Sequence, residues 1–355
     1  MRIVNLMISI LCLFSILVSY ALADEFTFDQ EKTFEVGKES AVLRLSNVSG
    51  EVIVESHLQD KVIIHVAKVV GTKDLQEAKQ KADRIEISIE KEGSTITVDT
   101  RFPKFKSRSF WGKVFGIETG NGAWVNYRIL VPTKTRIDIN TASADVSVRD
   151  IQEKVNISVA SGDVALENIL GEVNVTSASG DIDLYGAQGR ISLTGASSDV
   201  KVRRVKGDIR IATASGDVSG EKIDGELSVS LASGDLELSE VNGDIEARGA
   251  SGEFDIRQDH GSMSLSTSSG NINAKAAIAP GKKYSLQSTS GDVRLYIPLQ
   301  SSADFKLGTT SGNIKCKVPM ELRSVTSRKI EGQMNAGGAQ IQIQSTSGDI
   351  FLIGE

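Results

Sequence analysis

Residues 161–181 read Ser-Gly-Asp-Val-Ala-Leu-Glu-Asn-Ile-Leu-Gly-Glu-Val-Asn-Val-Thr-Ser-Ala-Ser-Gly-Asp, and the Ser-Gly-Asp step at each end of this stretch recurs every eighteen residues. Strict copies of the step begin at Ser161, Ser179, Ser215 and Ser233. Degenerate copies in the same register begin at Ser143, Ser197, Ser251 and Ser269. A period held over this many copies is typical of a repeat protein, in which each unit stacks on the next.

Each repeat also contains a second turn, halfway between two Ser-Gly-Asp steps, at Gly171, Gly189, Gly207, Gly225, Gly243 and Gly261. Between turns, apolar and polar residues alternate as in a strand with one buried face. The sequence therefore predicts an all-β fold: a right-handed parallel β-solenoid (β-helix) with two strands in each 18-residue coil. The alternative is an antiparallel meander with a turn every nine residues. It is less favoured because the similarity is stronger at eighteen than at nine.

Residues eighteen apart share size and character, because in such a coil they lie above one another about 4.8 Å apart. One apolar column is Val164, Ile182, Val200, Val218, Leu236, Phe254 and Ile272. A second is Val173, Ile191, Ile209, Leu227, Ile245 and Met263, and a third is Val175, Leu193, Ile211, Val229, Ala247 and Leu265. These columns predict a continuous core inside a rod roughly 55 Å long. After Asn271 the spacing loosens, since later copies begin at Ser290, Ser311 and Ser347, and the extra residues are expected in loops.

The beginning of the chain predicts export. Arg2 precedes an apolar run over 3–18, and Ala21-Leu22-Ala23 is typical of a cleavage site, so residues 1–23 are interpreted as a signal peptide. An uncleaved membrane anchor is the alternative. The expected location is the periplasm, the cell surface or the medium. Without residues 1–23 a single cysteine remains, Cys316, which excludes an intramolecular disulfide and is expected to pack in the core.

Residues 24–136 are predicted to form a β-rich N-terminal cap, and 137–355 the solenoid. In the cap, 72–84 has helical spacing, with Thr72 as the expected N-cap. Aromatic and basic residues are interleaved near its end, a combination suited to a polysaccharide, an anionic polymer or a lipid headgroup. The candidate ligand-binding residues are Phe102, Phe105, Arg108, Phe110, Trp111, Lys113 and Trp124. The alternative is a loop whose aromatic side chains cover the first coil.

The aspartates of the repeated steps are the second candidate site. Asp163, Asp181, Asp199, Asp217 and Asp235 should lie in a ladder at coil spacing, where oxygen ligands suit Ca²⁺. We weigh this against aspartates that bond local N–H groups in turns, which is the favoured interpretation. No glycine-rich calcium nonapeptide, nucleophile elbow or phosphate loop is present, so neither a cofactor nor an enzyme is predicted. A net charge of −6 argues against nucleic acid as the partner.

Several segments together resemble a known family. Phe34-Glu35-Val36-Gly37, the strand and turn over 45–52, the strand over 127–132, the serial Ser-Gly-Asp steps and the closing residues 345–350 are similar to the bacterial putative-adhesin family, a β-strand-repeat domain of unknown function. The resemblance implies the fold and offers no catalytic residues. The segment from Arg101 to Tyr127 is longer than in that pattern, so nothing is transferred to it.

These observations favour a non-catalytic binding, adhesin-like or scaffolding protein of the cell envelope, with a polysaccharide or a surface protein as its partner. An enzyme acting on envelope polysaccharide, which would need a groove with paired acids, is one alternative. A periplasmic signalling or assembly module that binds a single protein is the other.

Overall fold

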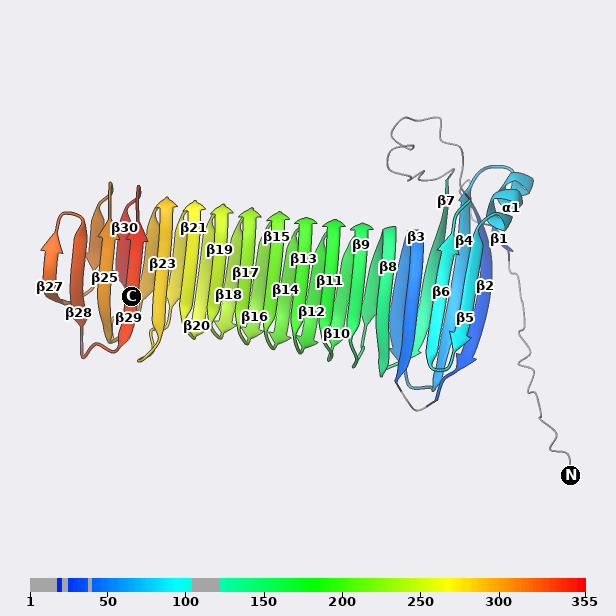
Figure 1. The fold of residues 1–355 in the computed structure, drawn as a ribbon, viewed down its shortest axis with the longest axis horizontal. Helices are drawn as coiled ribbons and strands as arrows, with labels where there is room; N and C mark the ends of the chain where they lie inside the picture. The colour runs from blue at the N-terminus through cyan, green and yellow to red at the C-terminus, as the bar shows by residue number, and fades with distance from the viewer. Residues whose placement is uncertain (1–17, 21–24, 38–39, 104–121) are drawn as a thin grey trace, which may run out of the picture.

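The chain forms a long rod crossed by strands along its whole length (Figure 1). The computed structural model describes residues 18–20, 25–37, 40–103 and 122–355. Each coil of the rod supplies two strands, which run in opposite directions in two stacks. We name these stack A and stack B, and Figure 1 shows one behind the other. The long strands β3 (Ala41–His57) and β8 (Thr135–Arg149) pass through a corner and belong to both stacks.

Stack A contains the strands that precede the Ser-Gly-Asp corners. In the regular part of the rod these are β9 (Val155–Ser161), β11 (Val173–Ser179), β13 (Ile191–Ser197), β15 (Ile209–Ser215), β17 (Leu227–Ser233), β19 (Ile245–Ser251) and β21 (Met263–Ser269). Stack B contains the strands that follow the corners. These are β10 (Val164–Ile169), β12 (Ile182–Gln188), β14 (Val200–Lys206), β16 (Val218–Asp224), β18 (Leu236–Asn242), β20 (Phe254–His260) and β22 (Ile272–Ala276).

Parallel pairing at eighteen residues holds the coils together. Val164 lies beside Ile182 in stack B, and Val173 lies beside Ile191 in stack A. All three predicted columns are buried and pair in this way along the rod. The predicted β-solenoid with two strands per coil is therefore confirmed. The meander is wrong, because residues that are neighbours across strands are eighteen apart and parallel.

Stack B carries a fourth buried column that the alternation did not predict. After Val164 and Leu166 the next inward residue is Ile169, because Asn168 has a φ of 55° and two consecutive side chains face outward. The same left-handed position recurs as Asp150, Asn168, Gly186, Arg204, Lys222 and Glu240. The buried residues that follow it are Ile151, Ile169, Ala187, Val205, Ile223 and Val241. A bulge in each of these six coils thus adds a further apolar contact to the core, whereas β20 alternates without a bulge and buries Gln258.

The Ser-Gly-Asp corner needs glycine because the backbones of successive coils almost touch there. Gly216 has a φ of +127°, and a Cβ placed on it would lie 2.2 Å from the carbonyl oxygen of Ser198 in the preceding coil. At Gly216 the positive φ and the close approach both disfavour a side chain, whereas Ala144 and Ser198 occupy the same position in degenerate copies without a positive φ. The corner therefore fixes coil spacing as well as chain direction.

The N-terminal end is broader than the rest of the rod. β6 (Thr95–Arg101) and then β5 (Glu86–Glu92) extend stack A beyond β3, while β7 (Ala123–Pro132), β4 (Lys61–Gly71), β2 (Glu25–Glu35) and the short β1 (Val18–Tyr20) extend stack B. Ser49 of β3 already lies beside Ser143 of β8 in the corner register.

The boundary at residue 136 stays a prediction. The signal peptide also stays a prediction, since 1–17 and 21–24 lie outside the described residues.

The predicted helix is present, but its cap is different. Helix α1 spans Leu75–Asp83, and the N-cap is Asp74, whose carboxylate accepts the N–H of Gln76 at 2.8 Å. Thr72 is therefore not the cap; its hydroxyl donates to Glu77 at 2.8 Å instead. The helix packs Ala78 and Ala82 against Val70 at the N-terminal end. In the part of the chain that the structure describes, no helix has the length and apolar character needed to cross a membrane.

The coils at the C-terminal end do not stack in sequence order. The strands here are β23 (Lys283–Ser290), β24 (Val293–Ile297), β25 (Ala303–Thr309), β26 (Ile314–Lys317), β27 (Glu321–Thr326), β28 (Lys329–Met334), β29 (Ala339–Ser345) and β30 (Ile350–Gly354). The coil β29–β30 lies between coils β23–β24 and β25–β26. The hairpin β27–β28 then extends stack A antiparallel to β25.

Cys316 on β26 is free and packs partly buried against the core, and burial raises the pKa of its thiol.

Candidate ligand-binding groove

The central outward positions of stack A are polar and largely uncharged. Two such positions on each strand between β9 and β29 hold Asn156, Ser158, Asn174, Thr176, Ser192, Thr194, Arg210, Ala212, Ser228, Ser230, Glu246, Arg248, Ser264, Ser266, Ser285, Gln287, Gln342 and Gln344. Most are hydroxyl or amide groups, and each can donate and accept hydrogen bonds. The repeat register places them in rows at coil spacing.

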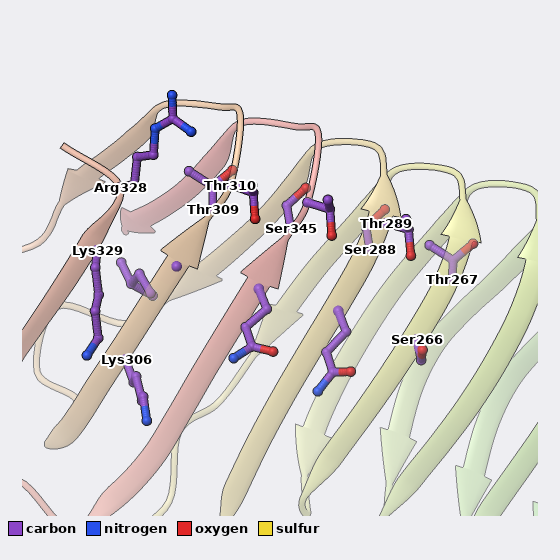
Figure 2. A pocket seen from close by; sticks show the side chains of 15 residues that line it. Ser266, Thr267, Ser288, Thr289, Lys306, Thr309, Thr310, Arg328, Lys329 and Ser345 are labelled. Atoms are coloured by element: carbon purple, nitrogen blue, oxygen red, sulfur yellow. The ribbon is translucent and has the colours of Figure 1, made fainter. Parts of the chain in front are cut away.

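These rows end in a hollow at the C-terminal end of stack A, which we name the groove (Figure 2). Its volume is about 480 Å³. The 15 residues that line it come from β21, β23, β29, β25 and the β27–β28 hairpin. They are Ser266, Thr267, Gln287, Ser288, Thr289, Lys306, Leu307, Gly308, Thr309, Thr310, Arg328, Lys329, Gln344, Ser345 and Thr346.

Gly308 forms the floor of the groove. It lies in the cross-strand row Ser266, Gln287, Gln344, Gly308 and Lys329, in which all the other residues carry a side chain. A Cβ added at Gly308 would meet no atom within 4 Å. The hollow therefore exists because one outward side chain is missing from the row.

A second row of hydroxyl groups belongs to the architecture. The hydroxyls of Ser288, Ser345 and Thr309 each donate to a corner carbonyl of a neighbouring coil, at Gly270, Gly291 and Gly348 respectively, and each distance is 3.1 Å. These side chains are buried, so their hydrogen bonds hold the corners. The groups left to meet a ligand are the outward amides, the exposed threonines and three cations.

The cations Lys306, Arg328 and Lys329 lie at one end of the groove, on β25 and on the hairpin (Figure 2). Lys329 forms an ion pair of 2.7 Å with Glu331, whose pKa is lowered by a hydrogen bond from Lys329. The lining contains no Asp, Glu, His or Cys. Its hydroxyl, amide and cationic side chains suit hydrogen bonding and charge attraction.

The structure places only two of the predicted aromatic and basic ligand-binding residues. Phe102 is half-buried against the core, and Trp124 is half-buried on β7 beside Val69 of β4. Phe105, Arg108, Phe110, Trp111 and Lys113 lie outside the described residues. A binding role for this segment stays a prediction.

The aspartate ladder is assembled as the spacing predicted. The carboxylates of Asp163, Asp181, Asp199 and Asp217 each accept the backbone N–H of the aspartate one coil further on, at 2.8 to 3.3 Å. The carboxylate of Asp235 accepts the N–H of Glu253 at 2.7 Å. These bonds join neighbouring coils, whereas the favoured interpretation from sequence placed them within the local turn. Within the described segments no group of three His, Cys, Asp or Glu side chains is arranged to hold a metal.

The sequence pattern did not predict the groove. Its residues stand up to eighty positions apart, from Ser266 to Thr346, and come together because coil β29–β30 is inserted out of order. The 18-residue period predicts only neighbours in sequence order. The loosened spacing after Asn271 was the one available signal.

Comparisons with known proteins agree with the repeat. The Toastrack DUF4097 family model matches residues 64–250 and 226–352. No curated protein matches the chain. Among solved structures, a putative cell adhesion protein from Clostridium sporogenes is 11% identical, with 92% of this chain and 100% of the other covered and a TM-score of 0.24.

Two further solved structures are similar over comparable lengths. A putative adhesin from Bacteroides fragilis is 12% identical, with 92% and 97% covered and a TM-score of 0.28. A putative lipid binding protein from Parabacteroides distasonis is 13% identical, with 92% and 96% covered and a TM-score of 0.26. These TM-scores are too low to carry an argument about function.

Proposed function

This chain belongs to the Toastrack DUF4097 family, and from that premise we propose that it is a non-catalytic binding protein whose stack A holds an extended polysaccharide, one part of which enters the groove. The observation that carries the proposal is the row of outward hydroxyl and amide groups that leads into the hollow above Gly308. The chain acts at the cell envelope or outside the cell, as the N-terminal sequence predicts.

An extended polysaccharide fits this surface because both partners present many neutral hydrogen-bonding groups. A single such bond contributes only about 1 kcal/mol after water is displaced. Rows repeated about every 4.8 Å allow many of these weak contacts to act on one polymer. The hollow at Gly308 gives one segment of that polymer a concave site, where more of its surface is buried than on the flat rows.

Binding of the purified exported protein to immobilised polysaccharides, measured by biolayer interferometry, tests the proposal. The probes are dextran, polygalacturonate and dextran sulfate. Gly308→Trp fills the groove where the structure has open space, and we expect it to weaken binding at least tenfold. Ser219→Trp is the matched control, because Ser219 faces outward on β16 in stack B.

Three results would contradict the proposal. Retained binding by Gly308→Trp would remove the groove as the site. Release of reducing sugar from any probe would favour the enzyme alternative. Failure of the wild-type protein to bind any polysaccharide, combined with crosslinking to one protein partner in cells, would favour the signalling or assembly alternative.

A further inference from the structure

We propose that the groove selects an acidic polysaccharide, one carrying carboxylate or sulfate groups, and that Lys306 and Arg328 are the side chains that recognise its charge. This inference rests on the proposed function and adds the chemical class of the ligand. It starts from the contrast between the groove and the rows that lead to it, because the rows are mostly neutral and the groove is not.

The charges around the groove are unbalanced. Its lining holds three cations and no carboxylate. Glu331 forms an ion pair of 2.7 Å with Lys329 and also lies beside Lys306 across β25 and β28, so that the hydrogen bond from Lys329 and the charge of Lys306 both lower its pKa. Asp304, the nearest acid on β25, forms an ion pair of 3.0 Å with Arg323. Among the residues in the described ranges, no ion pair within 4 Å is found for the side chains of Lys306 or Arg328. One carboxylate therefore faces three cations, and net positive charge remains for an incoming anion.

The two cations lie at the same end of the groove and are separated along the direction of β25. Lys306 is exposed on β25, two residues before Gly308. Arg328 lies near the residue that follows Gly308, because its carbonyl accepts the N–H of Thr309 at 3.0 Å. Figure 2 shows Arg328 close to Thr309 and Thr310, with Lys306 further down β25. At about 3.3 Å per strand residue, the segment from Lys306 to Thr309 spans about 10 Å, so the two cations contact separate acidic groups along one chain.

Neutral hydrogen-bonding groups complete the site between the cations. Gln344 faces outward beside Gly308, and Thr310 and Thr346 are exposed where the strands end. Amides and hydroxyls can bond the uncharged hydroxyls of a sugar, while a guanidinium can bond a carboxylate or sulfate through two N–H groups. The groove therefore combines the two kinds of contact that an acidic polysaccharide requires.

Charge selection here is local. The whole chain has a net charge of −6, which repels a polyanion at long range. Attraction by Lys306 and Arg328 acts only within about 8–10 Å at physiological salt. Binding is consequently expected to weaken as salt rises.

The test measures binding of the full exported protein to polygalacturonate, dextran sulfate and neutral dextran at two salt concentrations. The variant Lys306→Gln with Arg328→Gln removes two positive charges and keeps polar side chains. The control, Lys201→Gln with Arg204→Gln, removes two positive charges from β14 in stack B. We expect the groove variant to bind both acidic polymers at least tenfold more weakly, with the control unchanged and Arg328→Lys alone intermediate.

The outcomes separate this inference from the proposed function. If dextran binds as tightly as polygalacturonate and the groove variant binds like the wild type, charge selection is overturned. In that case the effect of Gly308→Trp still shows whether the groove is the binding site. Equal weakening by the control variant would show attraction to the surface in general and would also overturn it. If no polysaccharide binds, both proposals fail.

Discussion

Stack A and stack B are built from the same coils around the same core, yet their outer surfaces are unlike. In stack A the outward residues are mostly Ser, Thr, Asn and Gln. In stack B most are charged and several pair with one another, as Arg203 does with Asp183 through bonds of 3.0 and 3.1 Å. Further ion pairs join Arg149 to Glu167 and Lys222 to Glu221.

This difference shows that the repeat constrains the two sides of each strand separately. Inward positions must keep the size of their column, because each side chain packs on its copies in the neighbouring coils. Outward positions are free to vary, since solvent accommodates them. Stack B uses part of that freedom for ion pairs, whereas the outward positions of stack A carry mostly neutral groups that can form hydrogen bonds with another molecule.

The largest expected effect comes from the corner that the two stacks share. Gly216→Val forces a β-branched residue to a φ of +127° and against the Ser198 carbonyl, so we expect a loss of about 4 kcal/mol or more in the free energy of unfolding. Urea denaturation followed by circular dichroism measures it. Gly308→Val is the matched control, because its position is open and its φ is not positive. Equal loss in both variants would contradict the corner's role.

A smaller effect is expected where one side chain joins the two stacks at the N-terminal end. The hydroxyl of Tyr127, on β7, lies 2.5 Å from that of Thr100, on β6, and burial raises the pKa of Tyr127 to about 12. An unfolded tyrosine titrates near 10. The neutral side chain therefore stabilises the fold fully below pH 10, and about 2.7 kcal/mol is lost as the pH rises to about 12.

Tyr127→Phe removes this titration while keeping the ring. We expect its free energy of unfolding to fall less steeply between pH 10 and 12 than that of the wild type, as measured by urea denaturation at each pH. Tyr284, whose pKa burial also raises, stays in both proteins. If the free energy of unfolding falls equally with pH in the variant and the wild type, ionisation of Tyr127 does not cause the loss of stability at alkaline pH.

The smallest effect sharpens the contrast between the outer surfaces. Asp183→Asn removes a half-exposed ion pair of stack B, and we expect a loss of about 0.5 kcal/mol that disappears in 1 M salt. Asn174→Ala removes from stack A two hydrogen bonds of 3.0 Å that the Asn174 amide donates, one to Asn156 and one to the Glu172 carboxylate. Because the Asn174 side chain carries no charge, most of the cost should persist in 1 M salt. Thermal melting of both variants at low and high salt measures the two losses of stability. If both losses respond to salt in the same way, the contrast between the two outer surfaces is contradicted.

The core columns were predictable because period and alternation coincide in them. Val164 and Leu166 alternate, and their copies follow eighteen residues later. The column of Ile169 was missed because a bulge places it three residues after Leu166, out of the alternation. Apolar residues do recur every eighteen positions in this column, but the left-handed residue that precedes each of them differs in type between coils, for example Asn168 and Arg204. The residue type at that position therefore did not predict the bulge.

The groove was less predictable than the core because it depends on contacts outside the period. Gln344 lies beside Gln287 on one side and Gly308 on the other, at spacings of 57 and 36 residues rather than the 18 that joins neighbouring coils in the regular part of the rod. The helix cap illustrates a simpler ambiguity, since Thr72 and Asp74 are both good capping residues and only the backbone shows that Asp74 is used.

The inserted coil β29–β30 also determines the order in which the rod can form. Coils up to β24 can add one after another as the chain emerges, and β25 can pair with β28 of the hairpin, but coil β25–β26 cannot join the rod until residues 339–354 arrive. Closing that gap joins residues as far apart as Asp292 and Asp349, 57 positions along the chain, at a loop-closure cost that short repeats avoid. The last step in folding is thus slow compared with the stacking of neighbouring coils, and it is the step that creates the groove.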